Sequence, residues 1–295
     1  MRRTVNIISL ILGTLGLFFL LQQTQPAHSG EAWNALEPGL ELGFFVAPEK
    51  SEVGDSTIRI LRIDPSRFQL RLLNASTQND NQRQSAKDWA LSNGLIATIN
   101  ASMYQKDLLT SVSYMKTGDH INNRWVSKDK TFLAFDPKDE TLPRVRIIDR
   151  ECDDFDQLRQ QYKTLIQSIR MVSCQGENVW SPQARKWSTA ALGMDSTGHV
   201  LFIHVRSAYS THDLINHLLA LPIGIERLMY AEGGSEAQMY INNGKTEHEF
   251  VGGYTSDGQG DFAWPIPNVI GIARTQAPEN EHTGGRIDHT KEKTN

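Results

Sequence analysis

The stretch from Tyr230 to Tyr240, YAEGGSEAQMY, constrains the fold of this chain more than any other. The apolar run Ile225–Tyr230 before it predicts a strand, and apolar residues resume at Met239–Ile241 ahead of a turn signal. Between them lies Glu232-Gly233-Gly234-Ser235-Glu236, which we name the glycine turn. We therefore expect a strand, a tight turn carrying two carboxylates, and a second strand.

The composition of the glycine turn suits ligand binding. Gly233 and Gly234 have no Cβ, so the backbone can approach a ligand or adopt positive φ, and Ser235 adds a hydroxyl group. A carboxylate at a strand end can act as an acid, a base or a hydroxyl acceptor, which makes Glu232 the first catalytic candidate and Glu236 the second. The alternative is an acidic hairpin with a tight bend and no chemistry.

Other motifs precede and follow the turn in a definite order. They are Asn100-Ala101-Ser102-Met103-Tyr104 at a strand end, Ala191-Leu192-Gly193-Met194-Asp195 in a hairpin, and WPIPNVIGIAR at 264–274. With the glycine turn they resemble the phosphodiester glycosidase family over roughly residues 40–274. The resemblance implies an exported hydrolase that cleaves a sugar phosphodiester or a related glycosidic bond.

Three departures from the family pattern keep a second function open. Glu232 stands where members usually have Asp, and Glu236 and Ala237 replace serines. Many members have an arginine just before the central strand, where this chain has Trp187-Ser188-Thr189, with Arg185 nearby. The alternative function is a non-catalytic envelope module that binds a glycan or polymer in the same cleft.

Three further residues are candidates for substrate binding. The amide of Asn100 suits a sugar hydroxyl or a phosphate oxygen, although it could instead cap the following turn. Tyr104 could stack on a sugar ring or donate its phenol, or it could pack in the core. Arg170 is suited to bidentate phosphate binding, whereas a surface ion pair is the ordinary alternative.

The segment from Ser207 to Asp213 joins a predicted strand to a helix N-terminus, where backbone N–H groups favour anions. Ser207 is a binding candidate there. His212 is a third catalytic candidate, because imidazole titrates near neutral pH, but a solvated histidine in a first helical turn is the alternative. His217 lies five residues on, outside the i,i+4 metal spacing, and we expect no metal and no cofactor.

The first 29 residues read as a signal peptide. Arg2-Arg3 is followed by an apolar run from Ile8 to Leu21 and an Ala27-His28-Ser29 cleavage site. An uncleaved anchor is the alternative, although the apolar run is shorter than the roughly 20 residues of a span. Either way the domain, residues 30–274, is expected in the periplasm or outside the cell, with no stable membrane span after processing. The tail, 275–295, is expected to be disordered.

Composition narrows the classes of ligand that this chain is expected to bind. A formal net charge of −4, with no basic cluster, argues against nucleic acid and leaves a carbohydrate or sugar phosphate as the expected ligand. An oxidising compartment permits a disulfide between Cys152 and Cys174; two buried thiols are the alternative.

The pattern of elements predicts an α+β fold, a mainly antiparallel sheet with a few packing helices. Alternation such as that of Phe68–Leu72 marks half-buried antiparallel strands. Helices are expected at Ser85–Ser92, at Asp153–Ile169 and at 211–221. Strands are expected at 39–46, 57–73, 95–100, 110–116, 131–136, 143–149, 170–174, 188–194, 199–206 and 265–273.

Overall fold

The computed structural model describes residues 32–253 and 262–275. The chain divides into two units, Met1–Glu31 and Ala32–Asn295, and the described residues all belong to the second. The expected signal peptide and residues 276–295 of the tail lie outside the described residues. In the part that is described, no helix is long and apolar enough to cross a membrane.

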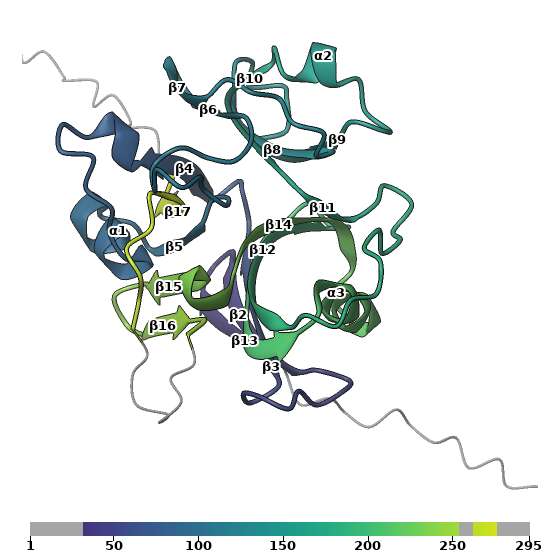
Figure 1. Cartoon of the computed structure of the whole chain (residues 1–295). Helices are drawn as coiled ribbons and strands as arrows, with labels where there is room; N and C mark the ends of the chain where they lie inside the picture. Colours follow the sequence, from purple (N-terminus) through teal and green to yellow (C-terminus); the bar gives the residue numbers. More distant parts are fainter. Residues whose placement is uncertain (1–31, 254–261, 276–295) are drawn as a thin grey trace, which may run out of the picture. The chain divides into compact units, whose positions relative to one another are not determined.

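Three antiparallel sheets form the described unit (Figure 1). The first sheet has the order β1 (Trp33–Glu37), β2 (Leu40–Val46), β3 (Thr57–Ile63), β13 (Val200–Tyr209), β12 (Trp187–Asp195), β14 (Ile225–Gly233) and β11 (Arg170–Val172). The second has β7 (His120–Asn123), β6 (Met115–Thr117), β10 (Tyr162–Ser168), β8 (Thr131–Pro137) and β9 (Val145–Asp149). The third has β16 (Glu247–Val251), β15 (Gln238–Asn242), β5 (Ala97–Asn100), β17 (Asn268–Arg274) and β4 (Phe68–Asn74).

The helices are few and short. They are α1 (Ala86–Asn93), α2 (Phe155–Leu158), α3 (Thr211–Ala220) and the 3₁₀ turns η1 (Ala75–Thr77) and η2 (Gly234–Glu236). The fold is therefore mainly antiparallel β, and the α+β expectation holds in the sense that a few helices pack on the sheets.

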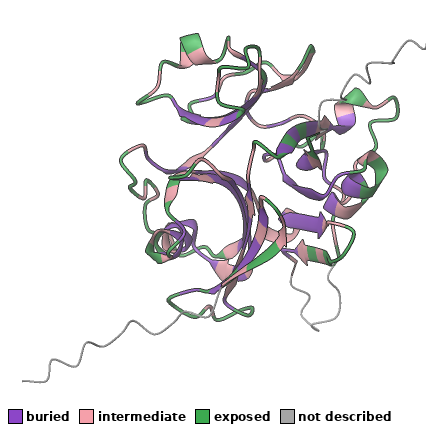
Figure 2. Cartoon of the chain, turned by 180° about the vertical axis from the view of Figure 1, so that it is seen from behind, coloured by how far each residue is buried: buried purple, intermediate pink, exposed green. Residues whose placement is uncertain are grey.

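The main core is shared by all three sheets. Its fully buried members include Leu61 and Phe202 from the first sheet, Leu133 from the second and Ile99 from the third. A second cluster forms where Leu214 and its neighbours on α3 pack on the other face of the first sheet, within the curve of β12, β13 and β14 (Figure 1). Figure 2 shows burial concentrated along the strands.

Local signals correctly predict α1 and α3. The hydroxyl of Ser85 accepts from the N–H of Asp88 to start α1, and Gly94 ends it in the left-handed conformation at φ 61°. Ser210 caps α3 by accepting from the N–H of Asp213. Strands β1, β7 and β16 were not predicted, because each is short and lies at or next to a sheet edge.

The expected helix at Asp153–Ile169 is wrong. Only Phe155–Leu158 is helical, and Tyr162–Ser168 forms β10, hydrogen-bonded to both β6 and β8. The apolar positions of this stretch fit a helical period, but Thr164, Leu165 and Ile166 are all buried on a strand between two neighbours. Such a strand is apolar on both faces, and its periodicity does not separate it from a helix.

The glycine turn connects the first sheet to the third. β14 runs between β12 and β11 and ends at Gly233, η2 follows, and β15 begins in the third sheet beside β5. Asn100 is the last residue of β5, so the strand pairing brings this residue to the turn from a position 136 residues away along the chain.

Candidate functional site

The two glycines of the turn are required for different reasons. Gly234 has φ +70°, which favours glycine over any residue with a side chain. Gly233 is extended but crowded: a Cβ there would overlap the hydroxyl of Tyr230 and lie 2.6 Å from Cδ1 of Trp187. The turn therefore packs directly under two aromatic side chains, neither of which was singled out from the sequence.

A further glycine, Gly252, packs directly against the turn. A Cβ on Gly252 would overlap the carbonyl oxygen of Gly234, and the Ser188 hydroxyl donates to the Gly252 carbonyl. The Gly252-Gly253 dipeptide is the sequence signal for this contact, but Gly252 was not predicted as part of the site.

Asn100 holds the glycine turn through both ends of its amide. Its Nδ2 donates to the carbonyl of Glu236 at 2.9 Å, and its Oδ1 accepts from the N–H of Gln238 at 2.7 Å. Asn100 and Gln238 are both almost fully buried. Beneath the same segment, His204 donates from Nε2 to the carbonyl of Ala237 at 3.2 Å, and burial lowers the pKa of His204 to about 3. The turn is thus held rigidly by neutral groups.

Glu232 has the environment of a general acid. Burial raises the pKa of its carboxyl group to about 8; the charge of Glu236 adds to the rise, and the N–H of Gly233, which donates to Glu232 Oε1 at 3.0 Å, opposes it. Glu236 instead accepts a hydrogen bond from the Ser235 hydroxyl at 2.9 Å. At neutral pH Glu232 is therefore mostly protonated beside a second carboxylate.

Two phenols share this electrostatic environment. Burial, and then the charges of Glu236 and Glu232, raise the pKa of Tyr104 to about 12. Burial, and then Glu232, also raise the pKa of Tyr230, whose oxygen accepts from Nε1 of Trp187 at 2.9 Å. Both side chains remain neutral donors close to the two glutamates, and substrate binding by Tyr104 stays a prediction.

Two arginines act on the phenols of Tyr104 and Tyr230. The charge of Arg83 lowers the pKa of the Tyr104 phenol and so opposes burial and the two glutamates, which raise it. The charge of Arg185 has the same effect on the pKa of the Tyr230 phenol. The guanidinium of Arg185 stacks over the Trp187 ring with its carbon 5.4 Å from the centroid. Neither Arg83 nor Arg185 has an ion pair among the described residues, so their charges are available to an anion.

Comparison with known proteins identifies the family of this chain. The sequence model of the family described as phosphodiester glycosidase matches residues 93–273. The chain belongs to the phosphodiester glycosidase family. No curated protein matches it.

Among solved structures, the catalytic domain of zebrafish N-acetylglucosamine-1-phosphodiester α-N-acetylglucosaminidase, auto-inhibited by its pro-peptide, has a TM-score of 0.60 at 13% identity, covering 81% of this chain and 85% of that one. A hypothetical protein from Synechocystis has a TM-score of 0.54 at 11% identity, over 80% of this chain and 62% of that one. At these identities the likeness concerns the fold.

In this chain, Ser207 and His212 make contacts of their own away from the turn. The fully buried Ser207 hydroxyl accepts from the N–H of Ser56 at 2.7 Å. Nδ1 of His212 contacts the carbonyl of Trp180. Among the described residues, hydrogen bonds join Asn100 to the glycine turn, and none joins the 207–213 segment to it. His212 reaches the site indirectly, through Trp180, whose ring centroid lies 5.8 Å from that of Tyr230.

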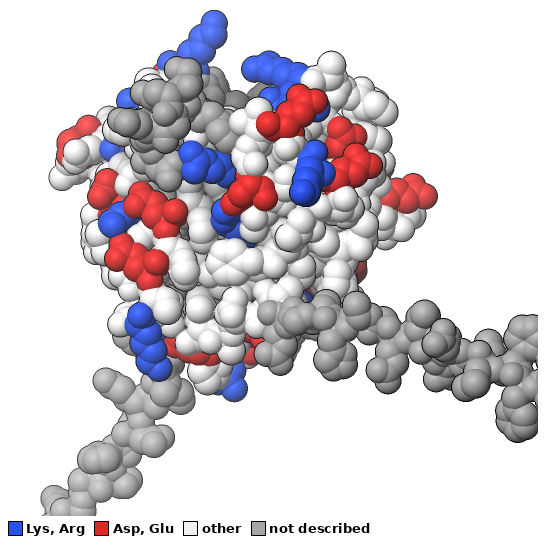
Figure 3. All heavy atoms as spheres, turned by 90° about the horizontal axis from the view of Figure 1, so that it is seen from below, with Lys and Arg blue, Asp and Glu red and all other residues white. Residues whose placement is uncertain are grey.

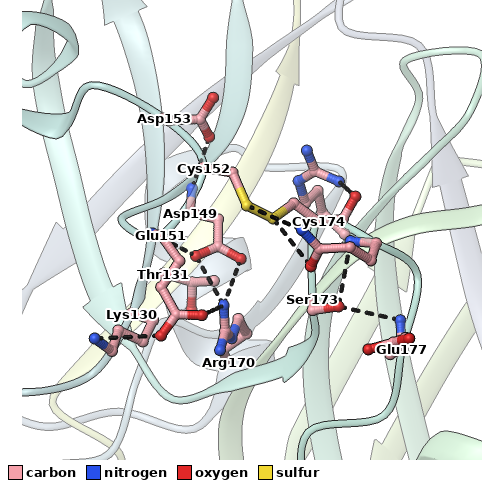
Figure 4. Close-up of polar contacts among 12 residues, drawn as sticks. Lys130, Thr131, Asp149, Glu151, Cys152, Asp153, Arg170, Ser173, Cys174 and Glu177 are labelled. Atoms are coloured by element: carbon pink, nitrogen blue, oxygen red, sulfur yellow. Dashed lines mark hydrogen bonds and ion pairs between the residues drawn. A yellow bond between two sulfur atoms is a disulfide. The ribbon is translucent and has the colours of Figure 1, made fainter.

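Arg170 forms a buried ion-pair network (Figure 4). Its Nη1 donates to both oxygens of Asp149 at 3.0 and 2.9 Å and pairs with Glu151 at 2.7 Å. The Asp149 side chain is fully buried. These contacts give Arg170 a structural function, and phosphate binding by this residue stays a hypothesis.

Cys152 and Cys174 form a disulfide beside this network (Figure 4). With Asp149 they are the one group of three metal-ligand residues found among the described residues. Because the two sulfurs are bonded to each other, they are not thiolates, and the group is not a metal site in this state.

Proposed function

We propose that this protein is an exported hydrolase that cleaves the glycosidic bond of a sugar phosphodiester. The observation that carries the proposal is the pair Glu232 and Glu236 on one rigid turn, with the first carboxyl group protonated near neutral pH. Glycoside cleavage uses two carboxyl groups whose surroundings set their pKa values apart. Family membership supports the reaction class.

Glu232 supplies the proton in this scheme. It protonates the phosphate oxygen that leaves as the bond to the anomeric carbon breaks, while the Glu236 carboxylate acts on the sugar side as base or nucleophile. Water completes the reaction, and its hydroxyl group ends on the sugar. General acid catalysis of this kind contributes about 10²–10⁴ in rate.

Arg185 and Arg83 are proposed to hold the phosphate, since both guanidiniums lie beside the phenols that border the glutamates. An arginine fits a phosphate in a bidentate way, and Arg185 occupies the neighbourhood in which many family members carry one. Asn100 serves the site by fixing the turn, because both atoms of its amide are already bonded to the backbone.

Export is part of the proposal. It rests on the order of basic, apolar and small residues in the first 29 positions and on the Cys152–Cys174 disulfide, a bond that persists in oxidising compartments. Mass spectrometry of an envelope fraction should find an N-terminus near Gly30. An intact Met1 in a membrane pellet would favour an anchor.

The test uses the chain from Gly30 onward, an N-acetylglucosamine 1-phosphodiester and water labelled with ¹⁸O. Cleavage at the anomeric carbon places the label in the released sugar. Label in the phosphate would show a phosphodiesterase and refute the proposal. UDP-N-acetylglucosamine and a glycerol-phosphate polymer extend the substrate range, and binding without turnover of any of them would favour the glycan-binding module.

A further inference from the structure

A cavity of about 470 Å³ lies next to the aromatic side chains that cover the glycine turn. Its walls include Trp180, Gln183, Arg170, Lys128 and Asp129. Trp180 lines the cavity, and its ring also lies against that of Tyr230 near the glycine turn. Burial, and then the charge of Glu232, raise the pKa of the Tyr230 phenol. The volume is in the usual range for a small-molecule site, about 300–1,000 Å³.

The charges around this cavity balance. Arg170 is paired with Asp149 and Glu151, and Lys130 is paired with Glu151 at 3.4 Å (Figure 4). The wall itself carries three cations, Lys128, Lys130 and Arg170, and one anion, Asp129; with the paired carboxylates of Asp149 and Glu151 the charges come to three of each sign. A site built for an anion would carry an excess of cations, so this balance favours a neutral, polar ligand.

Two buried donors in the cavity wall have no hydrogen-bond partner among the described residues. They are Nε2 of Gln183 and Nε of Arg170. A buried donor without a partner costs roughly 1–3 kcal/mol, and a hydroxyl oxygen placed in the cavity, with a small side-chain adjustment, would satisfy it. Hydroxyl groups of a sugar offer such acceptors at several positions around one ring.

Trp180 is fixed as a flat wall before any ligand arrives. Its Nε1 donates to the carbonyl of Arg170 at 2.8 Å, and its backbone N–H donates to Oδ1 of Asn178 at 3.0 Å. His212 contacts its carbonyl from the other side. A preorganised aromatic ring loses little conformational entropy on binding, so it is an effective surface for the C–H face of a pyranose.

We propose that this cavity binds a neutral pyranose ring, with Trp180 as its apolar wall and Gln183 as a hydroxyl partner. The inference rests on the proposed function, for which it supplies the sugar subsite, and it assigns His212 as a positioning residue that acts through Trp180. The phosphate would then lie toward Glu232 and Arg185, across the Trp180–Tyr230 contact.

The experiment measures calorimetric binding of methyl N-acetyl-α-glucosaminide and of inorganic phosphate to the mature chain. Trp180→Ala should weaken sugar binding at least tenfold, and Gln183→Ala about 2–10-fold, the value of one hydrogen bond. Neither variant should change phosphate binding. Trp125→Ala, which removes an exposed tryptophan outside the cavity lining, is the matched control and should bind the sugar as wild type does.

Kinetics separate this inference from the proposed function. With a sugar phosphodiester, both variants should raise KM with kcat little changed, as expected where the lost contacts stabilise the ground state and the transition state equally. Hydrolysis with unchanged KM in both variants would overturn the cavity assignment and leave the proposed function standing. If wild type does not hydrolyse the phosphodiester, but Trp180→Ala and Gln183→Ala still bind the sugar more weakly than wild type does, the proposed function is overturned and the cavity assignment is supported. Phosphate binding that depends on Gln183 would overturn the neutral-ligand assignment.

Discussion

The Asn100 side-chain amide donates to the carbonyl of Glu236 at 2.9 Å, so the end of β5 fixes the turn that carries both candidate catalytic glutamates. The same amide accepts from the next strand at Gln238. Through these two bonds the first motif fixes the second, although the bonded residues Asn100 and Glu236 lie 136 positions apart in the chain.

Asn100→Asp tests this relationship with an isosteric change. The aspartate keeps an acceptor for the Gln238 N–H but turns a second oxygen toward the Glu236 carbonyl, in a buried position. We expect a loss of roughly 1–3 kcal/mol in the free energy of unfolding, measured in urea, and a fall in activity. Asn34→Asp, at an exposed residue that also donates to a backbone carbonyl, should change stability by no more than about 0.5 kcal/mol. Equal effects in the two variants would contradict the assignment.

The raised pKa of Glu232 predicts a particular dependence of stability on pH. Between about 4.5 and about 8 the folded state holds this proton more tightly than the unfolded chain does. Stability from this group is therefore fully present at low pH and declines as pH rises toward 8, by up to about 1.4 kcal/mol per unit.

Urea unfolding at pH 5, 6.5 and 8 checks this dependence by comparing wild type with Glu232→Gln. The variant should gain stability relative to wild type as pH rises. Glu226→Gln, at an exposed glutamate of the same strand, should run parallel to wild type. Parallel curves for Glu232→Gln as well would show that Glu232 is not protonated in the fold.

Arg170 should be needed for stability more than for substrate binding. Arg170→Met leaves the buried Asp149 carboxylate without its main partner, which costs about 3–5 kcal/mol. Adding Asp149→Asn removes that charge and should recover a large part of the loss. If Arg170 binds phosphate, the double variant will be stable but will bind inorganic phosphate more weakly than wild type does, and the structural assignment will be incomplete.

The disulfide should contribute stability without chemistry. Cys152 and Cys174 are 22 residues apart, which corresponds to roughly 3 kcal/mol of loop entropy in the unfolded chain. The double serine variant should melt about 6–12 °C lower and keep its activity below that temperature. Reduced wild type is the control, and it should match the variant. Loss of activity at a temperature where the variant is folded would contradict a purely structural bond.

The sequence predicted best what is decided locally. The caps of α1 and α3 and the strand–turn–strand around Glu232 depend on neighbouring residues, and the structure has them. β10 was mistaken for a helix because its central residues are buried on both faces. The sequence did not reveal three residues of the site, Gln238, Tyr230 and Trp187. Their positions follow from the strand register, which shifts between Ala190 and Ala191, and no local pattern reveals such a shift.

The central claim is that Glu232 is the general acid for cleavage of a sugar phosphodiester. The most direct measurement is the pH dependence of kcat/KM for an N-acetylglucosamine 1-phosphodiester, with wild type and Glu232→Gln compared at matched folded fractions. The account predicts that wild-type activity falls above pH about 8 and that the folded variant is slower by at least about a hundredfold. A Glu232→Gln protein that retains the wild-type rate and pH profile would contradict it.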